Sequence, residues 1–418
     1  MNVYPPFKNK LENFSEEQLI KVLISFKDLS NREKFIKKYD QLKILGKFDL
    51  IPSILVNLKK EKIISFEKEE LIKLIEEDQV IFPSILDVIE ILELNDYKNS
   101  EISYSGKNVK VGIIDDGINR KSAAISHISL QKYALYGKEK FAKEEVEKSN
   151  ISHATIIASI ISNRFIDVND NYIGIAPNVN IFDFDISNSN QEFTFYHILN
   201  IIDKIYKEKI NLDILFITFT TKDSSDGNDL LSLACDLLVE KKIIVITSAG
   251  NYGPNPYTIG SPGAAKKVIT IGALTKELDV ANFSGRGPTL DERIKPDLCF
   301  PGSNITVPID SNLRLKVSGT SVSTAIAVGI IALIKEYDPN ITYDALLSLL
   351  NRSSMDLNHE KNAQGLGIVK VSDIFGNLDL FHEKLIPYNY LVKKSLRLSI
   401  EFLILLLIFF YFFYFFRI

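Results

Sequence analysis

VKVGIIDDGI, residues 109–118, says more about the architecture of this chain than any other segment. An apolar run leads into two carboxylates and a glycine, which is typical of a buried strand that ends in a tight turn. Further apolar runs bounded by Gly, Pro or Asn follow at residues 174–186, 213–221, 242–250 and 267–274. We therefore expect a series of buried strands from about residue 105 onward.

Helical patterns lie between and after these runs. They occupy residues 153–163, 195–208, 227–241 and 321–337. Strands that alternate with helices predict an α/β fold with a doubly wound parallel sheet. Such sheets place their active sites at the carboxyl ends of the strands.

The N-terminal part has a pattern of its own. Apolar and polar segments suggest the order β-α-β-α-β, in the segments 18–26, 30–39, 46–58, 67–77 and 79–86. This order predicts a small α+β domain over residues 12–87, with helices on one face of a sheet. It contains no histidine and no metal-binding cluster, so we expect a binding or folding module rather than a catalytic one.

Composition excludes some classes of protein. The 49 basic and 53 acidic residues are spread along the chain and give a net charge of −4, so no basic field for nucleic acid is expected. Cys235 and Cys299 are the two cysteines, too few for a disulfide framework, and two free thiols suit a reducing compartment. The first residues carry charge and no apolar core of a signal peptide, which predicts residence in the cytosol.

Three residues at the ends of predicted elements can carry chemistry: Asp115 after its strand, His153 at the start of a helix, and Ser321 at the start of another. Each has an ordinary structural explanation. The aspartate suits a turn, the histidine a buried hydrogen bond, and the serine a helix cap. Their order along the chain, Asp then His then Ser, is the order of the subtilisin triad.

Several ordered strings strengthen that observation, and through them the chain resembles the subtilisin-like serine proteases from about Tyr104 to Val371. The strings are VKVGIIDDGI (109–118), SHATIIAS (152–159), GIAPN (174–178), ITSAGNYGPN (246–255), NFSGRGP (282–288), KPDLCFPGSNI (295–305) and SGTSVSTA (318–325). The resemblance implies a peptidase in which His153 is the general base for Ser321, while Asp115 holds and stabilises the imidazole.

The resemblance extends to two further parts of the active site. Asn251 corresponds to the side-chain donor of the oxyanion hole, with the backbone amide of Ser321 as the second donor, although Asn251 also suits a plain turn. Thr218, Phe219 and Thr220 correspond to the substrate-binding strand. Thr220 replaces a usual glycine, so we expect a narrowed S1 pocket and restricted specificity. Other departures, such as Val322 after the serine, lie outside the triad.

The N-terminal segment 19–86 resembles, less closely, the subtilisin propeptide, which assists folding and inhibits the enzyme. This resemblance implies an intramolecular inhibitor whose tail enters the cleft, with cleavage between about Pro83 and Tyr104. No cofactor or metal is expected for catalysis. The loop 167–171 carries oxygen ligands that suit structural calcium, but it lacks the full pattern of a calcium loop.

The C-terminal run FLILLLIFFYFFYFF, residues 402–416, predicts a membrane anchor. We expect a peptidase domain at 104–375, a juxtamembrane linker at 376–399 and a transmembrane helix at 400–416. Basic residues precede the run, and only Arg417 follows it, so the positive-inside rule predicts a single-pass protein of the cell membrane with a cytoplasmic catalytic domain. A terminal helix packed on the protease core is the soluble alternative.

We therefore expect a serine endopeptidase for limited processing of peptides or proteins. One alternative is a catalytically silent homologue that binds peptides along residues 216–221 without cutting them. Another is a lipid or ester hydrolase, suggested only by the apolar tail, although the chain lacks the G-x-S-x-G motif of that class.

Overall fold

The computed structural model describes residues 2–78, 80–83, 104–127, 129–136, 140–142, 151–164, 174–187, 193–309, 313–371 and 373–375. Its largest element is an eight-stranded sheet with the order β15-β14-β13-β11-β6-β9-β7-β8. Neighbouring strands are parallel, except that β8 runs antiparallel to β7. The bounds are β6 (Lys110–Asp115), β7 (Ser129–Tyr136), β8 (Lys140–Ala142), β9 (Asn180–Asp185), β11 (Ile214–Ile217), β13 (Ile244–Ser248), β14 (Ile269–Leu274) and β15 (Leu298–Pro301).

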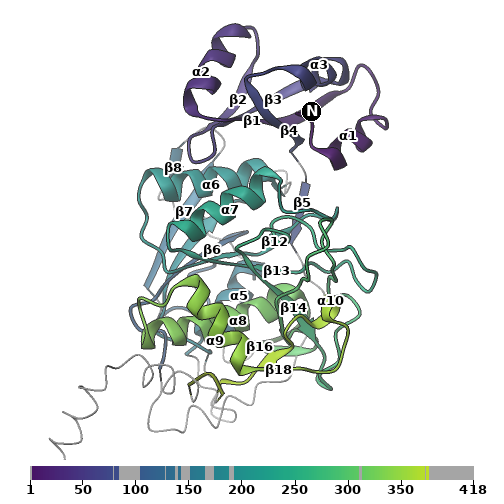
Figure 1. Cartoon of the computed structure of the whole chain (residues 1–418). Coiled ribbons are helices and arrows are strands. Elements are labelled where there is room, and N and C mark those ends of the chain that lie inside the picture. Colours follow the sequence, from purple (N-terminus) through teal and green to yellow (C-terminus); the bar gives the residue numbers. More distant parts are fainter. Residues whose placement is uncertain are drawn as a thin grey trace, which may run out of the picture.

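Helices cover both faces of this sheet (Figure 1). On one face, α5 (His153–Ser162) and α8 (Thr320–Tyr337) share a core with alternate residues of β6, such as Val111 and Ile113. On the other face, α6 (Phe195–Lys207) and α7 (Leu230–Glu240) pack on the remaining residues, including Ile114. The predicted α/β fold with a parallel sheet is therefore confirmed.

Strand β6 lies where the winding of the sheet changes direction. The chain first builds β7 and β9 on one side of β6 and then β11, β13, β14 and β15 on the other. Crossover connections leave such a strand in opposite directions, which opens a crevice at its carboxyl end. Asp115, the last residue of β6, lies at that point.

The N-terminal unit is a four-stranded antiparallel sheet with the order β2-β3-β1-β4. Its elements are α1 (Pro5–Leu11), β1 (Leu19–Phe26), α2 (Leu29–Lys38), β2 (Ile44–Phe48), β3 (Ser53–Lys59), α3 (Lys60–Ser65), the 3₁₀ helix η1 (Phe66–Lys68) and β4 (Ile72–Glu77). It has its own core, in which Phe35 packs on Phe26 and Phe66.

Two details of this unit differ from the prediction. The helix expected at 67–77 is wrong, because Ile72–Glu77 is strand β4 and the helix α3 precedes it. The apolar residues of LIKLI fit the periodicity of a helix as well as that of a strand. The pairing of buried Ile75 with buried Ile24 of β1 favours the strand. The segment 46–58 contains two strands rather than one, since the chain turns back between Phe48 and Ser53.

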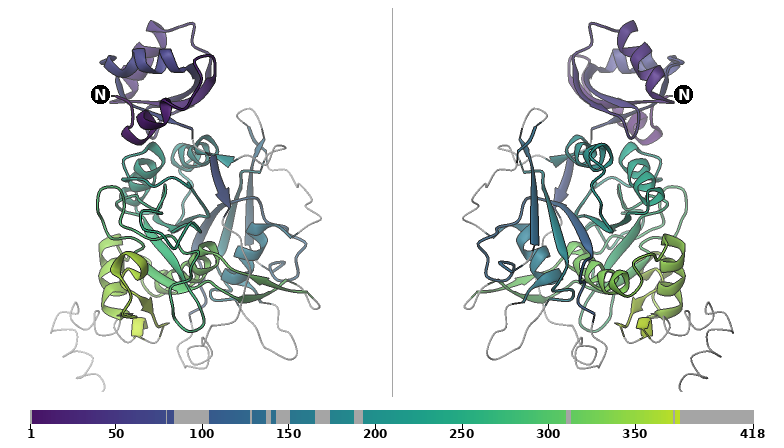
Figure 2. Two further views of the ribbon diagram at one scale, coloured as in Figure 1. Left: turned by 90° about the vertical axis from the view of Figure 1, so that its right-hand side faces the viewer. Right: turned by 90° about the vertical axis from the view of Figure 1, so that its left-hand side faces the viewer.

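The N-terminal sheet lies against α6 and α7 (Figures 1 and 2). Phe48 of β2 meets Tyr196 of α6 edge to face, with ring centroids 6.0 Å apart. The backbone nitrogens of Asp49 and Leu50 both donate to Asp203 of α6, at 2.8 and 2.9 Å. Apolar and polar contacts thus join the two units.

After β4 the chain enters the larger unit as strand β5 (Val80–Pro83). It lies between the short strands β10 (Phe193–Thr194) and β12 (Phe219–Thr220) and runs antiparallel to both. A segment of the N-terminal part is therefore the central strand of a sheet that belongs otherwise to the α/β unit.

The two ends of the α/β unit meet at the amino-end edge of its sheet. The Tyr104 ring stacks on the Phe375 ring at 5.2 Å, and both rings touch Tyr337 at the end of α8. The remaining elements are β16 (Ile305–Pro308), β17 (Arg314–Val317), α9 (Tyr343–Ser353), β18 (Ser354–Met355), α10 (Lys361–Gln364) and β19 (Ile368–Val369).

The predicted linker at 376–399 and membrane helix at 400–416 lie outside the described residues. Within the described part, α8 is the one helix long and apolar enough to cross a membrane, and most of it is buried. It is the central helix of the α/β core, so it gives no support to a membrane anchor.

Candidate active site

Asp115 and His153 form the first link of the site. Buried Asp115 ends β6, and its Oδ2 lies 2.7 Å from His153 Nδ1. Its other oxygen, Oδ1, accepts a hydrogen bond from the backbone nitrogen of Asp116 at 2.7 Å. Both oxygens of the carboxylate are therefore held, and one of them faces the imidazole.

His153 is positioned by the start of helix α5. Ser152 caps this helix by accepting a hydrogen bond from Thr155 N and donates its hydroxyl to Gly117 O, at 2.5 Å. The Asp116 carboxylate accepts a hydrogen bond from the backbone nitrogen of His153, at 3.3 Å, and another from the next residue. The turn after β6 and the first turn of α5 are thus tied together.

Ser321 completes the chain of contacts. It is the second residue of α8, and its Oγ lies 3.0 Å from His153 Nε2. The three predicted triad residues, far apart in the sequence, are therefore brought into hydrogen-bond contact in the order Asp115, His153, Ser321. The backbone nitrogen of Ser321 lies in the first turn of α8.

Asn251 lies beside the start of α8. Its Oδ1 accepts hydrogen bonds from both the backbone nitrogen and the hydroxyl of Thr320, each at 2.9 Å. With the amide oxygen engaged in this way, the amide nitrogen is left to face another group. Gly250 before it has φ +90°, a conformation that favours glycine, so the turn after β13 needs this residue.

The predicted substrate strand borders the site. Thr218 donates its hydroxyl to Ile114 O at 3.0 Å, which places it next to Asp115. Thr220 pairs with Phe82 of β5, and its Cγ2 lies 3.0 Å from the position that a Cβ on Gly250 would occupy. The Thr220 methyl group thus lies over Gly250.

The electrostatics of His153 follow from these contacts. Burial disfavours the charged imidazole, but the charge and hydrogen bond of Asp115, with a further contribution from Asp116, outweigh it and raise the pKa of His153 above its usual 6.5. The imidazolium that forms when a base takes a proton is therefore stabilised at this position.

The cysteines offer no competing nucleophile. Cys235 and Cys299 are buried and unpaired with each other. Burial raises the pKa of both thiols, that of Cys299 to about 12. Both remain protonated near neutral pH, and a protonated thiol is a poor nucleophile.

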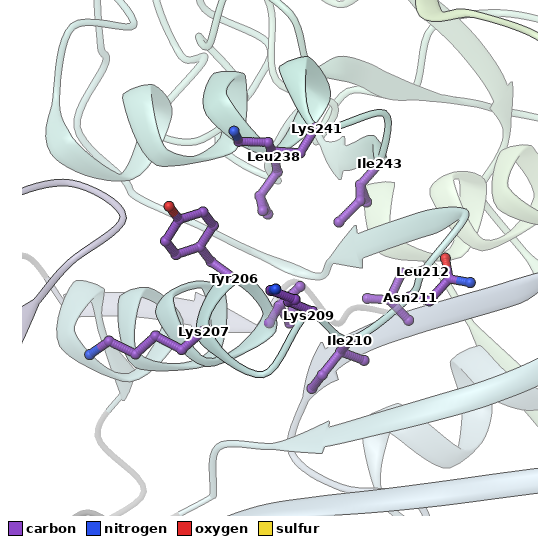
Figure 3. A pocket seen from close by; sticks show the side chains of 10 residues that line it. Tyr206, Lys207, Lys209, Ile210, Asn211, Leu212, Leu238, Lys241 and Ile243 are labelled. Carbon is purple, nitrogen blue, oxygen red and sulfur yellow. The ribbon is translucent and has the colours of Figure 1, made fainter.

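A pocket of about 450 Å³ lies on another part of the α/β unit (Figure 3). It is bordered by the ends of α6 and α7 and by residues 209–212, which precede β11. Its lining includes Lys207, Lys209 and Lys241 together with apolar side chains such as Leu238 and Ile243. This pocket is at the amino-end edge of the sheet, opposite the edge that carries Asp115.

No group of three or more metal-ligating side chains occurs within the described ranges. The loop 167–171, the candidate calcium site, lies outside them.

Two contributors to the geometry were missed by sequence reasoning. Asp116 holds the first turn of α5, and Thr320 orients Asn251. Both are next to predicted residues, and both are side chains that commonly bind free backbone nitrogens at helix starts. That preference was a usable signal for Asp116.

The chain matches one family of known proteins over most of the α/β unit. Residues 106–367 match the model of the subtilase family, Peptidase_S8. Serine protease AprX of Bacillus subtilis is 28% identical over 299 residues, which is 64% of this chain and 66% of AprX, slightly under two thirds of that protein. Subtilisin DY of Bacillus licheniformis is 27% identical over 270 residues, which is 64% of this chain and 91% of that protein.

Two solved structures resemble the fold. Fervidolysin from Fervidobacterium pennivorans, a keratinolytic enzyme related to subtilisin, has a TM-score of 0.65 at 17% identity and covers 86% of this chain and 61% of its own. The epidermin leader peptide processing serine protease EpiP from Staphylococcus aureus has a TM-score of 0.64 at 18% identity, covering 87% of this chain and 99% of its own.

Proposed function

Since this chain belongs to the subtilase family and is a subtilisin-like serine endopeptidase, we propose that it cleaves peptide bonds through an acyl-enzyme formed on Ser321. The observation that carries the proposal is the continuous contact from Asp115 through His153 to Ser321, with distances of 2.7 and 3.0 Å. A serine hydroxyl needs a neighbouring base to become a nucleophile, and His153 Nε2 is within reach of its proton.

In this mechanism His153 takes the Ser321 proton as the hydroxyl attacks the carbonyl and returns it to the leaving amine. Asp115 holds the imidazole tautomer and stabilises the imidazolium. The amide nitrogen of Asn251 and the backbone amide of Ser321 donate to the oxyanion that develops on the carbonyl oxygen. The bond from Thr320 to the Asn251 oxygen supports that orientation of the amide.

We propose limited processing rather than general degradation. The Thr220 methyl group lies over Gly250 and narrows the space between the strand β12 and the turn after β13. The resemblance to the family implies that Thr220 shapes the S1 pocket, so we expect a small residue at the substrate position before the cleaved bond to suit this site best. The substrate is a peptide or protein segment that binds in an extended form along β12.

The N-terminal domain is proposed to act as an inhibitor of its own enzyme. Strand β5 occupies the place beside β12 that an extended substrate would take. It runs antiparallel to β12 and so toward Thr218 and the carboxyl end of β6, where the triad lies. A substrate cannot pair with β12 until β5 leaves.

The C-terminal tail is proposed to anchor the enzyme in the cell membrane, with the catalytic domain in the cytoplasm. As a helix, the apolar run 402–416 has a length of about 22 Å at about 1.5 Å per residue, so neighbouring residues would have to complete a span of about 30 Å. Fractionation of cells that express the full chain tests this proposal, and recovery in the soluble fraction would reject it.

A fluorophosphonate probe tests the catalytic proposal. We expect it to label the wild type at Ser321 and to leave Ser321→Ala unlabelled, with peptide turnover lost in the same variant and the melting temperature unchanged. A silent peptide-binding homologue would not be labelled at all. An ester hydrolase would be labelled but would turn over esters and not peptides, so a peptide and a matched ester substrate separate the two enzymes.

A further inference from the structure

Three charged side chains lie in the interior of the sheet next to the catalytic aspartate. Asp183 and Asp185 of β9 are paired with Ile113 and Asp115 of β6, and Lys132 of β7 is paired with Asp183. Side chains alternate between the two faces along a strand, and residues paired across parallel strands share a face. Lys132, Asp183 and Asp185 therefore lie on the same face of the sheet as Ile113, the face that α5 and α8 cover. Parallel strands buried on both faces are normally apolar, so this group is unusual.

The group is compact and almost fully shielded from water. Lys132 Nζ lies 3.6 Å from Asp183 Oδ2 and 3.2 Å from Asp185 Oδ2. The exposed fractions are 7% for Lys132, 0% for Asp183 and 2% for Asp185. Buried charges are costly unless they are paired, so one ammonium group serves two carboxyl groups here.

The two carboxyl groups contact the turn that follows the catalytic aspartate. The Asp183 Oδ2 accepts a hydrogen bond from Ile118 N at 2.9 Å. Asp185 lies against Gly117, where an added Cβ would be 2.2 Å from its Oδ2. Gly117 is also the residue whose carbonyl receives the hydroxyl of Ser152, the cap of α5. The charged group thus forms a floor beneath the turn that joins Asp115 to the helix of His153.

The charges in this floor interact with those of the site. Burial raises the pKa of Asp183, Lys132 lowers it, and Asp185 and Asp115 raise it further, to about 7. Its Oδ1 has no hydrogen-bond partner among the described residues. Among the described residues, the charged or titratable groups that act on Asp183 include Lys132 of β7, Asp185 of β9 and Asp115 of β6.

We infer that Lys132, Asp183 and Asp185 are positioning residues for the peptidase reaction. They hold the turn 116–118 from below and so keep the Asp115 carboxylate in line with His153. The inference rests on the proposed triad chemistry. Their contacts reach one another and the turn that follows Asp115, so we expect their effect on the reaction to pass through that turn.

The test uses the full chain with paired substitutions at two positions. Lys132→Met removes the cation at similar length, and Lys132→Arg retains it. Asp183→Leu removes the acceptor for Ile118 N, and Asp183→Asn retains an acceptor oxygen without the charge. We expect Lys132→Met and Asp183→Leu to lower kcat about 10-fold or more at nearly unchanged KM, since displacement of a catalytic group by about 1 Å can cost about 10²-fold.

The conservative variants give the diagnostic readouts. Lys132→Arg should recover most of the rate, and Asp183→Asn should change the pH profile of kcat because one ionisation beside Asp115 is removed. A matched control is Asp297→Asn, since Asp297 also pairs with a buried lysine, Lys295, and accepts a backbone hydrogen bond, from Thr270 at the amino end of β14. It should affect melting without affecting the pH profile.

Rates are counted per molecule labelled by the fluorophosphonate probe, so that misfolded protein is excluded. Folded variants with the kcat and pH profile of the wild type would overturn the inference while the peptidase proposal stands. So would an Asp297→Asn variant that loses kcat to the same extent. A wild-type chain that the probe does not label would overturn both.

Discussion

The amide oxygen of Asn251 accepts hydrogen bonds from the backbone nitrogen and the hydroxyl of Thr320, the residue immediately before the proposed nucleophile, Ser321. The residue proposed to stabilise the oxyanion is therefore oriented by the same helix turn that presents Ser321. The two proposed donors are the amide nitrogen of Asn251 and the backbone amide of Ser321. Because Asn251 is bound to the residue before Ser321, the distance between the two donors is held fixed.

We expect Asn251→Ala to lower kcat by about 10²-fold with little change in KM, the scale found for loss of one oxyanion donor in subtilisin. Thr320→Val, which removes only one of the two bonds that orient the amide, should lower kcat by less. Steady-state kinetics of both single variants and of the double variant measure this. Additive effects of the two substitutions would contradict the coupling, because residues that act through one contact are not additive.

The acidic limb of the pH profile should lie above pH 6.5. The reaction requires neutral His153, and its pKa is raised, so activity appears only as the pH rises through that raised value and is lost on acidification. Asp116→Asn keeps an oxygen for the start of α5 and removes a charge that contributes to the shift, so it should move the limb to lower pH. The pH dependence of kcat/KM measures both, and a limb at or below pH 6.5 in the wild type would contradict the assignment.

A graded series at Thr220 should enlarge the substrate range. Because its methyl group lies over Gly250, we expect Thr220→Ser, Thr220→Ala and Thr220→Gly to accept progressively larger residues before the cleaved bond. Turnover of substrates with a small residue there should change little. A peptide library varied at that position provides the measurement, and a wild type that already cleaves after large aromatic residues would refute the restriction.

Two carboxyl groups should control how tightly the N-terminal domain binds to the α/β unit. Glu76 accepts a hydrogen bond from Leu230 N at the start of α7, and Asp78 accepts one from Tyr196 N at the start of α6, the latter at 2.9 Å. Loss of a helix cap costs about 1 kcal/mol, so Glu76→Ala and Asp78→Ala should each weaken inhibition about fivefold. Glu61→Ala, at an exposed position of α3, serves as the control.

The measurement is inhibition of the mature enzyme by residues 1–86 added in trans, which has a core of its own. Equal inhibition by all variants would argue that the carboxyl groups are not part of the docking energy. No inhibition by the unchanged segment would instead favour an adaptor that recruits substrate.

The sequence predicted those elements whose pattern is local, that is, visible in a few consecutive residues. Parallel strands buried on both faces are continuous apolar runs, so β6, β9, β11, β13 and β14 were predicted in their places. Strand β7 was not predicted, because its sequence SLQKYALY carries Lys132 at a position that the fold buries. The residues around Lys132 in the sequence do not indicate that Asp183 and Asp185 of another strand will pair with it.

The candidate site likewise has a part that was predictable from the sequence and a part that was not. The strings around Asp115, His153, Asn251 and Ser321 were readable because their order matches a known family. The floor beneath the site depends on the register of β7 against β9 and of β9 against β6, which only the assembled sheet defines. Long-range register of this kind has no signature in a single strand.

The stacking of Tyr104 on Phe375 brings the first and last described residues of the α/β unit together, and both rings pack on Tyr337. A unit whose ends are neighbours can be transplanted as a cassette into a surface loop of another protein, because its host has to span only a short gap. The same proximity would allow circular permutation, in which the two ends of the unit are linked and new termini are made in another loop. Ser321, the proposed nucleophile, lies at the other end of α8 from Tyr337, so neither change would touch its contacts directly.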